Sequence, residues 1–212
     1  TYPDSSTSSH AKAIAGKYSI SLSPVIEACF RMETPKTLGN VETIVTGSVR
    51  ELCAAAAEAC NALGYMPYIL TDSLNCKARE AGAFLAAIAR AHQNTDRSLA
   101  FLAGGETVVH LTGSGMGGRN QELALSAAEG IAGLRDTAVF SIGSDGTDGP
   151  TDAAGGFVTG QTKDDLGKKG IQIFDVLKNN DSYHALKLCD GLLHTGATGT
   201  NVNDVAVLLI RR

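Results

Sequence analysis

The chain has 212 residues, of which 43% are hydrophobic and 19% charged, and its net charge is -4 at pH 7. This composition is typical of a globular protein and excludes extensive disorder, and the acidic balance argues against a nucleic-acid-binding surface. No apolar run is long enough to span a bilayer, and the polar start of the chain does not resemble a signal peptide. We therefore expect a cytoplasmic protein without a membrane or nucleic-acid partner.

The first forty residues differ from the rest of the chain. Helices are predicted at residues 8–17 and 24–32, and Pro, Gly and Asn mark a linker at 33–40. Two helices without a strand to pack on are typical of the end of a domain whose beginning is absent. The predicted organisation is a helical remnant and linker of an N-terminal domain, residues 1–40, followed by an α/β domain, residues 41–212.

From residue 41 onward, apolar strand-like runs alternate with segments of helical periodicity. This alternation predicts a layered α/β/α domain with a mixed, mainly parallel central sheet. The two-glycine turn at residues 104–105 predicts that the strands on either side of it are antiparallel. Strands are expected at residues 41–46, 65–70, 98–103, 107–111, 138–142, 192–194 and 205–210. Helices are expected at residues 49–63, 76–92, 120–131, 163–170, 173–177 and 181–188.

Five scattered cysteines, Cys29, Cys53, Cys60, Cys76 and Cys189, form no closely spaced pair. Their odd number and irregular spacing argue against a zinc site and against a disulfide framework. We expect all five to be reduced thiols, as is usual in the cytoplasm.

A glycine-rich segment at residues 113–118 lies between the predicted strand at 107–111 and the predicted helix at 120–131. Glycines let the backbone approach a ligand closely, and a helix start offers free N–H groups and a positive dipole end. Arg119 at the junction adds a charged, fork-shaped donor. Together these features predict an anion site, most commonly for phosphate. The alternative is a glycine-rich hairpin with a surface arginine.

Three carboxylates, Asp145, Asp148 and Asp152, follow the predicted strand at 138–142 within one tight loop. Ligands of open α/β sheets bind beyond the carboxyl ends of strands, and clustered carboxylates there can hold Mg²⁺. The alternative is turn chemistry, because Asp and Gly are common turn residues.

Two further loops offer polar groups. Hydroxyls, amides and glycine N–H groups at residues 195–204 could cradle a phosphate or a polyol, although an ordinary turn between strands has the same composition. Glu106 directly follows the glycine turn at 104–105. A solvated hairpin tip is the alternative interpretation of that glutamate.

These loops carry motifs that occur together and in a fixed order, and the series closely resembles the C-terminal MOFRL domain of type II glycerate kinases. Some members of that family bear the name hydroxypyruvate reductase. The resemblance extends from about Leu99 to the C-terminus, and residues 33–36 and 41–65 resemble the join between the family's two domains more loosely. The motifs are residues 104–106, 117–125, 145–155, 180–183 and 198–204.

The resemblance implies ATP-dependent transfer of phosphate to D-glycerate in an interdomain cleft, with Mg²⁺ as cofactor. The family's N-terminal domain, which carries a catalytic lysine, is absent from this chain, so we expect the isolated chain to be inactive. That domain is the expected partner, and a homodimer is left open.

Arg119 matches the family's functional arginine. With it, Asp145 and Asp148 are assigned to catalysis, and Asp148 and Asp152 to the metal. Substrate and phosphate binding is assigned to Gly105, Glu106, Gly115, Gly117, Gly118, Asn120, Thr198, Thr200 and Asn201.

The chain departs from the family pattern at residues 75–79, where Asn-Cys-Lys-Ala-Arg replaces an expected Gly-Glu-Ala-Arg, and at Ala197, where a proline is expected. Two other functions stay open. Gly113, Gly115 and Gly118 spell a GxGxxG pattern, which favours an NAD(P)-dependent hydroxypyruvate reductase, although the acidic residue that should follow comes too late. A non-catalytic binding or assembly module is the third.

Overall fold

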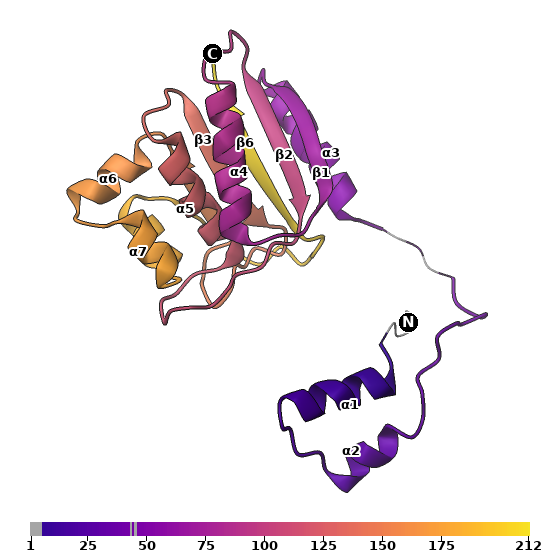
Figure 1. Ribbon diagram of the computed structural model, residues 1–212. Helices are drawn as coiled ribbons and strands as arrows, with labels where there is room; N and C mark the ends of the chain where they lie inside the picture. Colours follow the sequence, from indigo (N-terminus) through magenta and orange to yellow (C-terminus); the bar gives the residue numbers. More distant parts are fainter. Residues whose placement is uncertain (1–5, 43, 45) are drawn as a thin grey trace. The chain divides into compact units, whose positions relative to one another are not determined.

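The structure, a computed structural model, describes residues 6–42, 44 and 46–212, and the chain divides into two compact units, Thr1–Thr46 and Gly47–Arg212 (Figure 1). The first unit contains α1 (Ser8–Lys17) and α2 (Pro24–Cys29). The Thr7 and Ser23 side chains cap the two helix starts by accepting backbone N–H groups, which satisfies donors that a helix leaves unpaired. Neither helix buries its apolar face well, as Ile14, Val25 and Ile26 are exposed.

The second unit is built on a mixed sheet. In residues 47–212, all of which the structure describes, six strands are arranged in the order β1-β2-β6-β3-β4-β5. Figure 1 shows β1, β2, β6 and β3 side by side in this order. The strands are β1 (Met66–Leu74), β2 (Leu99–Gly105), β3 (Thr137–Gly143), β4 (Gly155–Thr159), β5 (Leu192–Leu193) and β6 (Asp204–Ile210).

The sheet is less parallel than the sequence suggests. Strands β1 and β2 form a parallel pair, whereas each of the other neighbouring pairs is antiparallel. The cause is β6, the last strand of the chain, which enters between β2 and β3 and runs against both. The mixed sheet is confirmed, but the expectation of mainly parallel neighbours is wrong.

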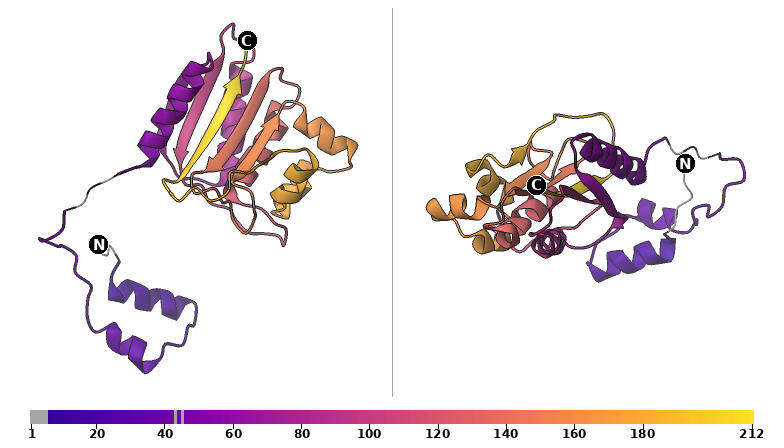
Figure 2. Two further views of the ribbon diagram at one scale, coloured as in Figure 1. Left: turned by 180° about the vertical axis from the view of Figure 1, so that it is seen from behind. Right: turned by 90° about the horizontal axis from the view of Figure 1, so that it is seen from above.

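Helices cover both faces of the sheet, which confirms the predicted α/β/α layering. Helix α3 (Val49–Ala62) lies on one face, and α4 (Ala78–Ala91) and α5 (Arg119–Ile131) lie on the other (Figure 2). Three short helices, α6 (Thr162–Lys168), α7 (Ile173–Lys178) and α8 (Ser182–Leu188), pack beside α5. Among the described residues, none of the helices combines the length and apolar character that crossing a membrane requires.

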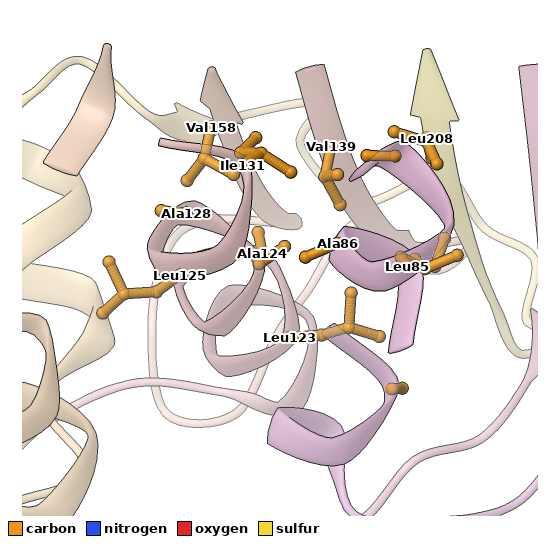
Figure 3. Close-up of a cluster of buried hydrophobic side chains, with 14 of the residues drawn as sticks. Leu85, Ala86, Leu123, Ala124, Leu125, Ala128, Ile131, Val139, Val158 and Leu208 are labelled. Atoms are coloured by element: carbon orange, nitrogen blue, oxygen red, sulfur yellow. The ribbon is translucent and has the colours of Figure 1, made fainter. Parts of the chain in front are cut away.

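The main core lies between the sheet and the pair α4 and α5. Alanines at the contact let these two helices approach closely, and Gly82 lies so near α5 that a Cβ there would clash with the carbonyl oxygen of Leu123. Figure 3 shows part of this core: Leu85 and Ala86 of α4, Leu123, Ala124, Leu125, Ala128 and Ile131 of α5, and Val139, Val158 and Leu208 of the strands.

A smaller core lies under α3, where Cys53 and Cys60 pack on Leu102 and Val207. Burial raises the pKa of both thiols, which keeps them protonated and unreactive. All five cysteines of the chain are free.

Two predicted strands are wrong. Residues 107–111 form a loop with an isolated bridge between Val108 and Lys77, because β6 already occupies the edge of β2 to which they would have paired. Of the predicted strand at 41–46, the described residues 41, 42, 44 and 46 are not in a strand, and residues 43 and 45 lie outside the described part.

One strand was not predicted. Strand β4 begins with Gly155 and Gly156, which have the composition of a loop. The glycines are needed because a Cβ at Gly155 would clash with the carbonyl oxygen of Ser141 on β3. At Gly156 a Cβ would meet the Leu186 side chain of α8 and Ala124 of α5, so close packing, and not turn formation, accounts for these two glycines.

The contact between α4 and α5 predicts the effect of Gly82→Ala. The added methyl group meets backbone, which cannot move aside as a flexible side chain could, so the free energy of unfolding should fall by about 2 kcal/mol or more. Gly167→Ala is the matched control, because nothing lies within 4 Å of the added atom in α6. That change should be neutral or stabilising by up to about 1 kcal/mol. Equal effects of both substitutions in urea unfolding would contradict the close helix contact.

Candidate functional site

The loops that follow β2 and β3 lie beyond the carboxyl ends of these strands, beside the start of α5 (Figure 1). They line a cleft of about 690 Å³. This is the edge of an open sheet at which ligands bind. The lining includes most of the residues predicted for the site: Glu106, Gly115, Gly117, Gly118, Arg119, Asp145 and Asp148.

Arg119 is held by two carboxylates. Its Nε and Nη2 atoms donate to the two carboxylate oxygens of Asp204, at 2.6 and 3.1 Å, and its Nη1 atom donates to Glu106 at 2.8 Å. The hydrogen bonds with Asp204 raise the pKa of Arg119 further above its already high value, so the guanidinium stays charged. The side chain of Asp204 is 9% exposed and that of Glu106 is 55% exposed. The Asp204 contact is therefore the anchored one, and the Glu106 contact faces solvent.

Asp148 caps α5. Its carboxylate accepts the backbone N–H groups of Asn120, at 3.1 Å, and Gln121, at 2.8 Å. Gly118 is needed for this approach, because a Cβ there would clash with the carboxylate. Burial is the main cause that raises the pKa of Asp148 to about 6. Two of the N–H groups that the sequence analysis expected to be free for an anion are thus bonded to the chain's own carboxylate.

The glycine-rich segment at residues 113–118, here called the glycine loop, is also hydrogen-bonded mainly within the protein. The backbone N–H groups of residues 112–116 all donate to residues 179–181. Gly113 and Gly115 are glycines because a Cβ at either position would clash with that segment. In residues 47–212, the N–H groups of Gly117, Gly118 and Arg119 have no acceptor. The donors available to a ligand are therefore fewer than predicted, and they lie at the start of α5.

Asp145 is braced by neighbouring loops. One of its oxygens accepts the backbone N–H of Thr147 at 2.9 Å, and the other accepts the Asn201 amide at 3.3 Å. Thr198 donates its hydroxyl to the carbonyl of Ser144, beside Asp145. Thr198, Thr200 and Asn201 do not line the cleft, so in this structure the loop that contains them supports Asp145 from behind.

Three other predicted site residues also lie outside the cleft lining. Gly105 packs on the backbone of Leu74 with a φ of 147°, and Asn120 is buried, with its amide oxygen accepting the Ser141 hydroxyl at 2.5 Å. Asp152 is exposed and accepts the Tyr183 hydroxyl at 2.8 Å, a bond that lowers the pKa of Asp152.

The assigned metal ligands, Asp148 and Asp152, therefore have separate partners: the start of α5 and Tyr183. Among the described residues, no group of three or more His, Cys, Asp or Glu side chains is arranged to hold a metal ion. The assignment of a metal to this pair stays a prediction.

Four residues of the site were not predicted from the sequence. Asp204 ends the 198–204 motif and anchors Arg119. Glu122, Arg79 and Asn180 form a buried hydrogen-bonded group behind the glycine loop. Asn180 and Asp204 lie in the 180–183 and 198–204 motifs, which was a signal for both, whereas Glu122 belongs to a polar helix start and no local pattern marks it as buried.

The model of the MOFRL family matches residues 99–204, which contain the cleft's loops. The chain belongs to the MOFRL family. It spans about half the length of the curated relatives that it matches.

Two such relatives are the D-glycerate 2-kinase of Thermotoga maritima and the glycerate 2-kinase of Pyrococcus horikoshii. They are 49% and 40% identical to this MOFRL chain over 99% of its length, which is 51% of each relative. The crystal structure of glycerate kinase from Thermotoga maritima superposes with a TM-score of 0.83 at 50% identity, over 98% of this chain and 51% of that one.

The buried cap predicts a pH dependence of stability that Asp148→Asn removes. The pKa of Asp148 in the folded chain, about 6, lies above the ordinary value of 3.8, so the folded state binds the proton more tightly than the unfolded state. The contribution of Asp148 to stability is therefore fully present at low pH and declines as the pH rises between these values. From about pH 4 to about pH 7, the free energy of unfolding of the wild type should fall relative to Asp148→Asn by on the order of 2–3 kcal/mol.

Asp152→Asn is the control in the same loop. The pKa of Asp152 is lowered, so its contribution should change in the opposite direction as the pH rises. Parallel pH profiles for the wild type and Asp148→Asn in chemical unfolding would show that the Asp148 carboxylate is not buried.

Proposed function

We propose that this chain forms the C-terminal part of an ATP-dependent glycerate kinase, in which it supplies one wall of a cleft where phosphate passes to D-glycerate. The observation that carries the proposal is the state of Arg119. Two of its nitrogens donate to the buried carboxylate of Asp204, while the third, Nη1, donates to the exposed Glu106 inside the cleft. The names of the relatives support a kinase acting on glycerate.

Glu106 stands where an anionic ligand would bind. Its side chain is more than half exposed, so it can leave Nη1 of Arg119 at small cost when a phosphate or the glycerate carboxylate arrives. Asp204 would keep the guanidinium plane in place during that exchange. The unpaired N–H groups of Gly117 and Gly118 lie beside Arg119 in the chain and would offer further donors to the same anion.

The charge of the cleft favours a metal-bound nucleotide over a free anion. The lining contains the carboxylates of Glu106, Glu122, Asp145 and Asp148, and in residues 47–212 Arg119 is its one cationic side chain. A free polyphosphate would be repelled by this excess of carboxylates, whereas Mg²⁺ bound to the phosphates would offset it.

Asp145, together with Glu106 once it is released, fits the role of holding Mg²⁺ better than the predicted pair. Both line the cleft, whereas Asp148 caps α5 and Asp152 lies outside the lining. Carboxylate oxygens beside water are the donor set that Mg²⁺ prefers, and the ion would neutralise charge on the phosphate oxygens. Asp145 would also be placed to accept a hydrogen bond from a hydroxyl of glycerate.

Phosphoryl transfer depends on positioning and charge neutralisation, and this chain supplies only part of both. The catalytic lysine that the family resemblance implies would come from the other domain. We therefore expect this chain to fold without turning over glycerate. Its free thiols, including the exposed Cys29, fit a reducing compartment such as the cytoplasm.

The geometry disfavours the NAD(P)-dependent reductase. A dinucleotide fingerprint follows a strand and leaves its glycines open to the pyrophosphate. Here residues 107–111 are a loop, and the close approaches at Gly113 and Gly115 are taken by residues 179–181.

The test compares this chain alone with this chain joined to the N-terminal half of the Thermotoga maritima relative. ATP-dependent phosphorylation of glycerate should appear only in the joined protein. There, Arg119→Ala should lower kcat/KM by on the order of 10²-fold or more, and Arg119→Lys should restore only part of it, because a point charge does not replace the planar fork.

A second variant separates catalysis from stability. Arg119→Ala leaves Asp204 buried without a partner and should cost about 2 kcal/mol of stability. Adding Asp204→Asn removes the unpaired charge, so the double variant should recover stability but not activity. Robust turnover by the chain alone would contradict the proposed need for the other domain, and recovery of activity along with stability in the double variant would refute the proposed role of Arg119.

A further inference from the structure

A short turn that borders the cleft, residues 179–181, binds the neighbouring segment 112–116 through each of that segment's backbone N–H groups. These five consecutive N–H groups donate to three consecutive residues, Asn179, Asn180 and Asp181. The bonds are Thr112 N and Gly113 N to Asn180 Oδ1 (2.7 and 2.9 Å), Ser114 N to Asn179 Oδ1 (3.2 Å), Gly115 N to Asn179 O (2.8 Å) and Met116 N to Asp181 Oδ1 (2.9 Å).

Asn180 makes the most contacts in this turn. It is 5% exposed, and its carboxamide is used from both ends: Oδ1 accepts two loop N–H groups, while Nδ2 donates to the carbonyl of His110 at 3.1 Å and to Oε2 of Glu122 at 3.2 Å. Its backbone has a φ of 55°, a conformation that asparagine adopts more readily than most residues. A carboxamide carries its acceptor oxygen and its two N–H donors on separate atoms, so this one side chain can bind both sets of partners at the same time.

The partner of Asn180 ties this turn to α5. Glu122 is 2% exposed and lies in the first turn of α5, three residues after Arg119. Its other oxygen accepts Nε of Arg79 at 3.1 Å, and Nη2 of Arg79 donates to the carbonyl of Leu177 at 3.0 Å. One hydrogen-bonded group therefore connects α4, α5, the end of α7 and the glycine loop.

We propose that Asn180 is a positioning residue: it fixes the glycine loop to the first turn of α5, and thereby sets where Gly117, Gly118 and Arg119 stand in the cleft. Asn180 borders the cleft, but it is 5% exposed and both ends of its carboxamide are bonded within the chain, so it acts through Glu122 and the backbone of residues 110–113 and not by contact with the ligand. The catalytic consequence rests on the proposed function, whereas the effect on the loop does not.

The loop effect is tested by hydrogen exchange on the 212-residue chain. Asn180→Gly keeps the positive φ and removes the carboxamide, so the amides of Thr112 and Gly113 should exchange on the order of 10- to 100-fold faster, while those of β6 should not change. Asp190→Gly is the control, because Asp190 also has a positive φ, of 53°, is exposed and, in residues 47–212, makes no hydrogen bond to residues 112–116. It should leave exchange at residues 112–116 unchanged.

A rescue pair tests the contact between Asn180 and Glu122. Asn180→Asp loses the donor and places a second carboxylate against Glu122, so it should loosen the loop. Adding Glu122→Gln supplies a donor from the other side and removes one charge, so it should recover at least half of the lost protection. This pair also decides the matter if Asn180→Gly does not fold.

Kinetics in the joined protein then separate positioning from a general structural role. Asn180→Gly should lower kcat at least 10-fold with a smaller change in KM, and the rescue pair should recover part of kcat. The proposal is overturned if the amides of residues 112–116 stay protected, if β6 loses protection equally, if the second substitution restores nothing, or if kcat is unchanged in a loosened loop. Absence of glycerate phosphorylation by the unsubstituted joined protein would instead refute the proposed function, and the exchange result would stand.

Discussion

The bond between Arg119 and Asp204 holds the cleft together. Asp204 is the first residue of β6 and lies opposite Gly105 of β2 and Gly143 of β3, so its carboxylate stands where three central strands meet. Arg119 is the first residue of α5. Two parallel N–H···O bonds between these side chains fix the helix start to the middle of the sheet with defined direction as well as distance. Nη1, the third nitrogen of the guanidinium, thereby faces the cleft.

Two other acidic residues also fix the start of α5. Asp148 caps the helix start, and Glu122 joins its first turn to Arg79 and Asn180. Each buries a polar group that would be costly without its partners, so the group as a whole favours one arrangement of the loops. Hydrogen bonds within the chain therefore fix the loops that line the cleft, and little further ordering of their backbone is needed when a ligand binds.

How far the sequence predicts this protein depends on how local each signal is. The α/β layering, the central helices and the gathering of Glu106, Arg119, Asp145 and Asp148 followed from periodicity, loop chemistry and family resemblance. The glycine-rich segment was expected to lie against a ligand. In the structure, Gly113 and Gly115 instead lie against residues 179–181, a turn more than sixty residues further along the chain. The order of the strands in the sheet could not be predicted from the sequence either. Whether β6 inserts beside β2 depends on pairing over a hundred residues of separation, which no local pattern reports.

The central claim is that Arg119 exchanges Glu106 for an anionic group of the ligand while Asp204 holds it in place. The direct measurement is a crystal structure of the joined protein with a non-hydrolysable ATP analogue, Mg²⁺ and glycerate. The account predicts a phosphate or carboxylate oxygen within about 3 Å of Nη1, with Glu106 displaced and both bonds to Asp204 intact. Ligands bound elsewhere, with Arg119 still bonded to Glu106, would contradict it.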